Sequence, residues 1–319
     1  MIRHYNIPVF VPHKGCPNDC VFCNQKKITG VTENENFGEI ESMISEHLST
    51  MERPSYIEIA FFGGSFTGID VSLQKKYLEI AEKFVDEGKV DGIRLSTRPD
   101  YISKEILDML KSYGVTAVEL GAQSMNDDVL LKNRRGHRAE DTVKAVALLK
   151  EYGFETGLQM MTGMYGSDAQ TDLVSGEEIA ALAPDTVRIY PTVVLGETML
   201  EKLYEAGEYI PPSLDESVEV CAKLYRLFEE KGIRIIRTGL QATDTICEKG
   251  SIVAGAYHSA FGELVRSRII RDEMEVKVKR GERIIFVPKK QISVAIGQKR
   301  SNIKYFKEKY GIDIEVKEI

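Results

Sequence analysis

Hydrophobic and polar positions alternate between two patterns over the first 240 residues. Short runs rich in β-branched residues, typical of buried strands, are separated by longer stretches with apolar residues at the i, i+3, i+4 spacing of a one-sided helix. The strand-like runs are residues 7–11, 56–62, 92–97, 115–120, 155–160, 186–190 and 234–237. Regular strand–helix alternation predicts a parallel sheet with helices outside it.

Capping signals agree with these boundaries. Ser103 precedes a helical stretch that stops at Gly114, and Ser213 with Glu216 has the spacing of a capping box before a stretch that ends at Gly232. The chain contains about six strand–helix repeats, whereas a closed barrel needs eight. This number favours an α/β fold of the partial (β/α)6 TIM-like barrel kind. In such folds the chemistry gathers at the carboxyl ends of the strands.

The pattern changes in the last third of the chain. We therefore expect a barrel domain over residues 1–245 and a small α+β extension over residues 246–319. Residues 274–279 and 284–287 predict a β-hairpin. A helix is predicted between Gly297 and Gly311, followed by a strand over residues 312–316.

Length and composition describe an ordinary globular protein. The 319 residues are 43% hydrophobic and 29% charged, and no apolar run reaches the roughly 20 residues that a membrane span needs. The N-terminus lacks the apolar core of a signal peptide, so we expect a cytoplasmic protein with no membrane partner. Of the five cysteines, Cys221 and Cys247 stand apart and are interpreted as buried or incidental thiols.

Charge is distributed unevenly. Residues 264–319 carry 15 Lys and Arg against 8 Asp and Glu, a net charge of +7, so the other 263 residues carry −14 of the total of −7. A basic tail on an acidic body favours contact with a polyanion, although a solvated charged surface explains the charge equally well.

Three cysteines in one short segment carry the clearest chemical signal. Cys16, Cys20 and Cys23 have the spacing CxxxCxxC, which lets one loop surround a single inorganic centre. Three thiolates leave one iron of a four-iron cluster open, which is a catalytic arrangement. The alternative is a zinc site completed by His13.

Other strand ends carry glycines and hydrogen-bonding groups. Gly63 and Gly64 follow the second strand, and paired glycines let a ligand approach the backbone, although a tight turn explains them nearly as well. Ser96 and Arg98 follow the third strand and are candidate ligand contacts, with a structural turn as the alternative. Arg135 follows the fourth strand, and an arginine can bind a carboxylate with two hydrogen bonds.

Several motifs together resemble a known family. The segments GGSFTG, STRPDY, ELGAQSMNDDVL, RRGH, GLQMMTGMYG and RIYPTVVLGETMLEKLYEAGEYIPPS follow the cysteine loop in this order. Their order and spacing resemble the radical half of the elongator catalytic subunit, within the radical S-adenosylmethionine superfamily. The resemblance covers roughly residues 6–243, and a weaker similarity reaches the oxygen-independent coproporphyrinogen oxidases.

The resemblance implies cofactors and contacts. Cys16, Cys20 and Cys23 would hold a [4Fe–4S] cluster that binds S-adenosylmethionine. By position, the implied cofactor contacts are Phe22 near the adenine, Gly63 and Gly64 at the methionine amine, Gln123 at the ribose and Arg135 at the carboxylate. Gln159 stands where the coproporphyrinogen oxidases have an aspartate, and a buried polar group is its alternative interpretation.

Three departures limit the resemblance. We expect no acetyltransferase domain in this chain, whereas the elongator subunit carries one, and the cysteine spacing is shorter than in many elongator subunits. Ser65 also replaces the glutamate that many members of the superfamily have after the paired glycines. The contact with the methionine amine is therefore left to the backbone. Carboxymethylation of a wobble uridine is therefore not transferred to this chain.

Two C-terminal segments are further candidates. The segment around Gly297, Lys299 and Arg300 resembles a degenerate KH loop that contacts RNA, with a structural α/β cap as the alternative. Tyr257 and His258, flanked by glycines, are candidate catalytic residues, and a packed turn explains them equally well.

The sequence therefore predicts an enzyme that cleaves S-adenosylmethionine reductively to a 5′-deoxyadenosyl radical. We expect a flavodoxin- or ferredoxin-type electron donor and an RNA substrate of the tRNA class. The alternatives are a radical enzyme acting on a small molecule or tetrapyrrole, and a zinc-stabilised RNA-binding protein without catalysis.

Overall fold

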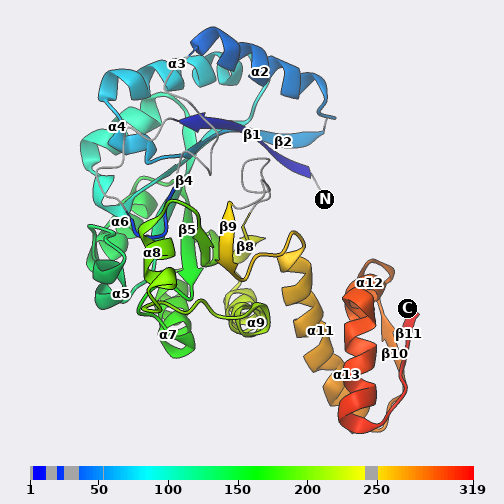
Figure 1. Cartoon of the computed structure of the whole chain (residues 1–319). Helices are drawn as coiled ribbons and strands as arrows, with labels where there is room; N and C mark the ends of the chain where they lie inside the picture. Colours follow the sequence, from blue (N-terminus) through cyan, green and yellow to red (C-terminus); the bar gives the residue numbers. More distant parts are fainter. Residues whose placement is uncertain (1–2, 12–19, 25–35, 53, 241–250) are drawn as a thin grey trace.

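Seven strands form one curled parallel sheet in the order β1-β2-β3-β4-β5-β6-β8 (Figure 1). This computed structural model describes residues 3–11, 20–24, 36–52, 54–240 and 251–319. The strands are β1 (Arg3–Val11), β2 (Ser55–Gly63), β3 (Gly92–Thr97), β4 (Val115–Gln123), β5 (Glu155–Thr162), β6 (Thr186–Pro191) and β8 (Arg234–Thr238). All seven predicted strands are confirmed, and so is the partial TIM-like barrel.

Helices cover the outer face of this sheet. They are α2 (Phe37–Ser49), α3 (Val71–Asp86), α4 (Lys104–Ser112), α6 (Ala139–Glu151), α7 (Ala169–Ala181) and α9 (Leu214–Glu230), with the short α5 (Asp127–Lys132) and α8 (Met199–Glu205) in connections. Side chains alternate between the two faces of a strand. In β2, Ile57, Ile59 and Phe61 are buried in the core with the helices, so Glu58 and Phe62 lie on the opposite, concave face.

The predicted capping signals are confirmed. Ser103 Oγ accepts a hydrogen bond from the Ile106 amide at 3.3 Å and caps α4. At the start of α9, Ser213 Oγ accepts from the Glu216 amide at 3.3 Å, and the Glu216 carboxylate accepts from the Ser213 amide at 2.8 Å. These bonds satisfy amides that a helix leaves without partners in its first turn.

The hairpin predicted at residues 274–279 is wrong, because these residues end the long helix α11 (Phe261–Lys279). Met274, Val276 and Val278 alternate with polar residues as in a strand, which misled the prediction. In the helix, Met274 and Val278 are four residues apart and both are buried, whereas Val276 is 51% exposed. Packing of one helical face therefore decides the structure.

The end of the chain forms a second, smaller core. It contains β10 (Ile284–Val287), α12 (Ile292–Ile296), α13 (Ser301–Tyr310) and β11 (Glu315–Glu318), together with the short helices η4 (Lys289–Gln291) and η5 (Gln298–Arg300). β10 and β11 pair in parallel. The predicted strand at residues 284–287 and the helix end at Gly311 are confirmed, whereas the last strand begins at Glu315, three residues later than predicted.

Helix α11 belongs to both cores. Val265 and Ile269 in its first half pack in the barrel core, and Met274 and Val278 in its second half pack in the small core. Figure 1 shows α11 connecting the barrel to α13, β10 and β11. The domain boundary at residue 245 is thus a proposal that places this shared helix in the C-terminal part.

The short elements that follow three of the strands were not predicted. β7 (Val193–Leu195) follows β6 directly and pairs antiparallel with β9 (Ile252–Gly255). The short helices η2 (Phe66–Gly68) and η3 (Pro99–Tyr101) follow β2 and β3.

Among the described residues, no helix combines the length and apolar character required to cross a membrane.

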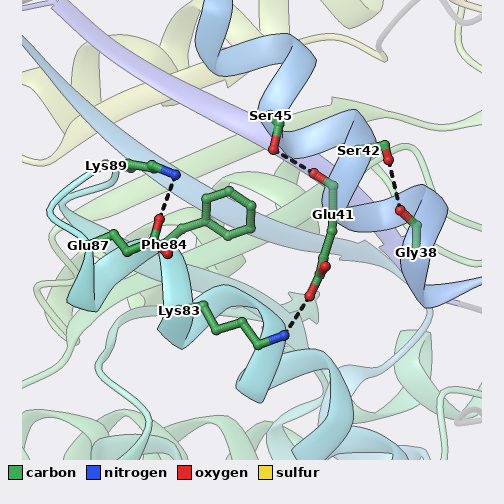
Figure 2. A pocket seen from close by; sticks show the side chains of 8 residues that line it. All are labelled: Gly38, Glu41, Ser42, Ser45, Lys83, Phe84, Glu87 and Lys89. Carbon is green, nitrogen blue, oxygen red and sulfur yellow. Dashed lines mark hydrogen bonds and ion pairs between the residues drawn. The ribbon is translucent and has the colours of Figure 1, made fainter.

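A groove of about 530 Å³ lies on the outer surface between α2 and α3 (Figure 2). Its polar side chains bond to one another and to the helices: Lys83 Nζ lies 2.7 Å from Glu41 Oε1, and Ser42 Oγ donates to the Gly38 carbonyl at 3.0 Å. These paired groups explain the groove as a contact between neighbouring surface helices.

The register of α11 can be tested with two matched substitutions. Val278→Ala should lower the free energy of unfolding by about 2 kcal/mol, because two buried methyl groups contribute about 0.8 kcal/mol each and a cavity adds to the loss. Val276→Ala should change it by less than about 0.5 kcal/mol. Denaturant unfolding measures both. Equal losses would contradict the helix, because a strand places the two valines on one face.

Candidate active site

The described part of the cysteine loop is a short turn. The Cys23 amide donates to the Cys20 carbonyl at 3.0 Å, which brings the two thiols onto one turn. Cys20 is 5% exposed, and Cys23 is half-buried. Cys16 and the alternative ligand His13 lie outside the described residues, and within those residues no three metal-binding side chains cluster.

Neighbouring segments fix this turn from two sides. Val21 packs in a small apolar cluster with Val194, Leu200 and Tyr209. The Val21 amide donates to the Asn133 carbonyl at 3.3 Å, and the Leu200 amide donates to the Val21 carbonyl at 2.7 Å. Phe22, the predicted adenine contact, packs against the same cluster.

Arg135 contacts the cysteine turn directly. Its Nη1 lies 3.4 Å from Cys20 Sγ, and its Nη2 donates to the Gly121 carbonyl at 2.7 Å. The Arg134 carbonyl lies 3.8 Å from the same sulfur. The fold therefore places the segment after α5 against a cysteine that precedes it by 115 residues.

Arg98 binds the backbone of Arg135. Its guanidinium forms two 2.9 Å hydrogen bonds to Asp100, and its Nη2 donates to the Arg135 carbonyl at 2.5 Å. Ser96 is half-buried, and its Oγ lies 3.5 Å from the Phe61 carbonyl. The cofactor contacts assigned to Ser96 and Arg98 stay predictions, and the contacts of Arg98 describe a structural brace.

The glycine turn after β2 offers its backbone. Gly63 has a φ of 105°, which favours glycine. Ser65 Oγ bonds to Thr97 Oγ1 at 2.8 Å and accepts from the Arg98 amide at 3.3 Å, so its side chain is engaged within the protein. This arrangement agrees with a backbone role for Gly63 and Gly64.

Two glutamines meet at the carboxyl ends of β4 and β5. Gln159 Nε2 donates to Gln123 Oε1 at 3.2 Å. Gln123 has a φ of 64°, and a Cβ on Gly121 would lie 2.8 Å from Gln123 Nε2. Glycine at position 121 therefore allows the Gln123 side chain to fold back over its own strand, β4.

A buried charge network covers the concave face below these residues. Arg94 binds Glu58 at 2.9 Å, Glu119 at 3.3 Å and Glu155 at 2.8 Å, and Arg188 binds Glu119 at 2.5 Å. Burial alone would raise the pKa of Glu58, but its hydrogen bond from His4 and the charge of Arg94 hold that pKa below its ordinary value.

Sequence reasoning missed this network. Its signal was present, because four of its charged residues each stand between two apolar residues of a strand. The segments are Ile57-Glu58-Ile59, Ile93-Arg94-Leu95, Val118-Glu119-Leu120 and Val187-Arg188-Ile189. Arg188 also lies over the Phe62 ring, with 5.3 Å between the guanidinium carbon and the ring centroid.

Tyr257 and His258 lie in the turn between β9 and α11. His258 Nδ1 accepts a hydrogen bond from the Ala260 amide at 3.1 Å, and the Tyr257 amide donates to the Gly255 carbonyl at 2.9 Å. Ala254, just before this turn, packs with the cluster that holds Val21. The turn therefore begins beside the cysteine loop, and the catalytic assignment stays a prediction.

The C-terminal loop presents two basic side chains. Gly297, Lys299 and Arg300 have φ angles of 77°, 50° and 62°, and both basic residues are exposed. Asn302 beneath the loop is buried and donates to the Ser267 and Ala295 carbonyls at 3.1 and 3.0 Å. The loop is thus fixed to α11 and α12, with its charges toward solvent.

The donor set fits an iron–sulfur cluster. Two thiols lie on one turn at the carboxyl-terminal edge of the sheet, and a buried guanidinium next to one of them compensates the charge of a thiolate.

Comparison with known proteins identifies the family of this chain. The profile of the radical SAM superfamily matches residues 10–175, and that of the radical SAM C-terminal domain matches residues 184–271. The tRNA uridine(34) acetyltransferase of Methanocaldococcus infernus is 32% identical over 241 residues, covering 69% of this chain and 44% of that protein. Elongator complex protein 3 of Homo sapiens is 33% identical over 142 residues, covering 44% of this chain and 26% of that protein.

The fold is shared with solved structures. Elp3 of M. infernus with an N-terminal deletion superposes with a TM-score of 0.67 and 27% identity, covering 87% of this chain and 64% of that one. Streptococcus suis SuiB bound to S-adenosylmethionine, at 11% identity and a TM-score of 0.54, covers 77% of this chain and 50% of that one, and shares the fold alone. The chain spans less than half the length of the curated relatives described here.

The buried His137 should make the stability of the fold sensitive to acid. Burial, together with the charge of Arg135, lowers the pKa of His137 to about 4 from 6.5. The unfolded chain binds the proton first, so the stability gained from the neutral imidazole is complete above pH 6.5 and is lost as the pH falls toward 4. The loss should reach about 3 kcal/mol.

Unfolding measured between pH 7 and pH 4 tests this dependence. His137→Gln should reduce the pH dependence of the free energy of unfolding in that window. An unchanged dependence in the variant would assign the acid sensitivity to other groups.

Proposed function

The chain belongs to the radical S-adenosylmethionine superfamily, and from that premise we propose that it is an enzyme that modifies RNA, with tRNA as the substrate class. The [4Fe–4S] cluster and S-adenosylmethionine are the cofactors of this superfamily. The observation that carries the proposal is the turn of Cys20 and Cys23 against Arg135 at the carboxyl-terminal edge of the sheet. Cys16 would complete the ligand set.

When bound, the cluster and S-adenosylmethionine would supply radical chemistry, which is the removal of a hydrogen atom from the substrate. The protein positions the reactants and excludes water. Gly63 and Gly64 offer a backbone edge to the methionine amine, and the Gln123–Gln159 pair offers amide groups to the ribose. A flavodoxin- or ferredoxin-type protein is the proposed electron donor.

The RNA assignment rests on two independent supports. The relatives that share this domain include proteins named for tRNA uridine modification. The exposed Lys299 and Arg300 lie in a fixed loop on the basic C-terminal part, where backbone and cationic groups suit phosphate contacts. The loop Gly297–Arg300 is accordingly proposed as an RNA contact. The reacting atom on the RNA is not assigned.

The cluster can be tested by removing one thiol. Protein purified without oxygen and reconstituted with iron and sulfide should be brown and should form 5′-deoxyadenosine slowly with dithionite. Cys20→Ala should lose the colour and the product, since one of three ligands is gone.

Cys221→Ala is the matched control. Burial raises the pKa of Cys221 to about 12, and its sulfur contacts Thr162 in the core, so it should not ligate iron. Cys221→Ala should retain the colour and product. A protein containing zinc and no acid-labile sulfide would contradict the proposed function.

The RNA contact can be tested by charge reversal. Lys299→Glu with Arg300→Glu should weaken tRNA binding and reduce the slope of log K against log salt by about 1 for each lost phosphate contact. Gel shifts at several salt concentrations measure both effects.

Lys144→Glu with Lys223→Glu changes the net charge equally on the barrel helices and serves as the control. Equal weakening in both double variants would indicate a general charge effect and contradict a contact at the loop. Binding unaffected in both would favour a small molecule or tetrapyrrole as substrate.

A further inference from the structure

We propose that Arg135 donates a hydrogen bond to the Cys20 thiolate in the cluster-loaded protein and thereby raises the reduction potential of the cluster. This inference rests on the proposed function, because it concerns the same cluster. Arg135 would be a positioning and tuning residue: it acts on the ligand, not on the substrate. Its starting point is the 3.4 Å separation of Arg135 Nη1 from Cys20 Sγ.

The guanidinium is held in place by its second amino group. Nη2 donates to the Gly121 carbonyl at 2.7 Å, on the strand that ends in Gln123. Arg135 is 6% exposed, so few conformations are open to this side chain. A planar guanidinium fixed at Nη2 has its Nη1 direction fixed as well.

The backbone of Arg135 is also anchored. Its amide donates to the Leu130 carbonyl at 3.0 Å, and its carbonyl accepts from Arg98 at 2.5 Å. Arg98 is itself held by two hydrogen bonds to Asp100. Movement of Arg135 away from the cysteine turn would therefore break contacts on three segments.

The direction of the effect follows from electrostatics. Reduction adds one electron to the cluster, here from dithionite, and makes the cluster more negative. A positive donor beside a ligand sulfur stabilises the reduced state more than the oxidised state, so the potential rises. Burial strengthens the effect, because little water screens the charge.

This role differs from a contact of Arg135 with the carboxylate of S-adenosylmethionine. In the structure, the two terminal nitrogens are directed at Cys20 and at the Gly121 carbonyl. A carboxylate contact predicts a change in cofactor affinity, whereas a thiolate contact predicts a change in cluster potential without the cofactor. The two roles are separable by experiment.

The test is a redox titration of the reconstituted full chain in the absence of S-adenosylmethionine. Electron paramagnetic resonance monitors the reduced cluster at each potential. Arg135→Gln should shift the midpoint potential to a more negative value, and Arg135→Lys, which keeps the charge but loses the planar fork, should shift it less. Arg134→Gln removes an exposed charge from the same segment and should leave the potential unchanged.

Each result has a defined meaning. Equal potentials in the wild type and Arg135→Gln would overturn the inference, as would weaker cofactor binding with an unchanged potential. An equal shift in Arg134→Gln would overturn it in favour of long-range charge. If Arg135→Gln fails to hold a cluster, Arg135→Lys decides: a potential equal to the wild type overturns the inference. A wild-type protein without a cluster would instead contradict the proposed function.

Discussion

The salt-bridge network around Arg94 joins the strands of the barrel across its concave face. One buried guanidinium binds carboxylates from β2, β4 and β5, and Arg188 on β6 binds the central one, Glu119. Burying a single charge of this kind would be very unfavourable, so each carboxylate and guanidinium depends on its partners. Burial alone would lower the pKa of Arg94, but Glu58 and Glu119 raise it above its ordinary value. These charges can meet only while the sheet keeps its curvature. The same curvature sets the positions of the side chains at the carboxyl ends of the strands.

Above this network, the site is assembled from segments far apart in the sequence. The cysteine turn, the segment of Arg135 and the Gln123–Gln159 pair meet at one edge of the sheet. Parallel strands with external helices bring the ends of successive strands together, which explains why the sequence motifs follow strands. The apolar cluster of Val21, Val194, Leu200 and Tyr209 then fixes the turn that carries the thiols.

Local pattern predicted much of this arrangement. The seven strands and the caps at Ser103 and Ser213 followed from periodicity and spacing alone. Three features did not follow. Val276 and its neighbours have a strand-like pattern, and only the packing of α11 between two cores overrides it. The contact of Arg135 with Cys20 depends on chain geometry over 115 residues. The charges on the concave face were visible as interruptions of apolar strands, but their pairing needs the strand order.

The shared helix α11 has a mechanical consequence. Its 19 residues extend for about 28 Å as one rigid rod. Because each half of the helix packs in a different core, the helix acts as a spacer. It holds the loop of Lys299 and Arg300 at a fixed distance from the barrel. If this loop binds RNA as proposed, a substrate would have to extend along the length of this helix in order to contact the loop while its reacting part lies in the barrel.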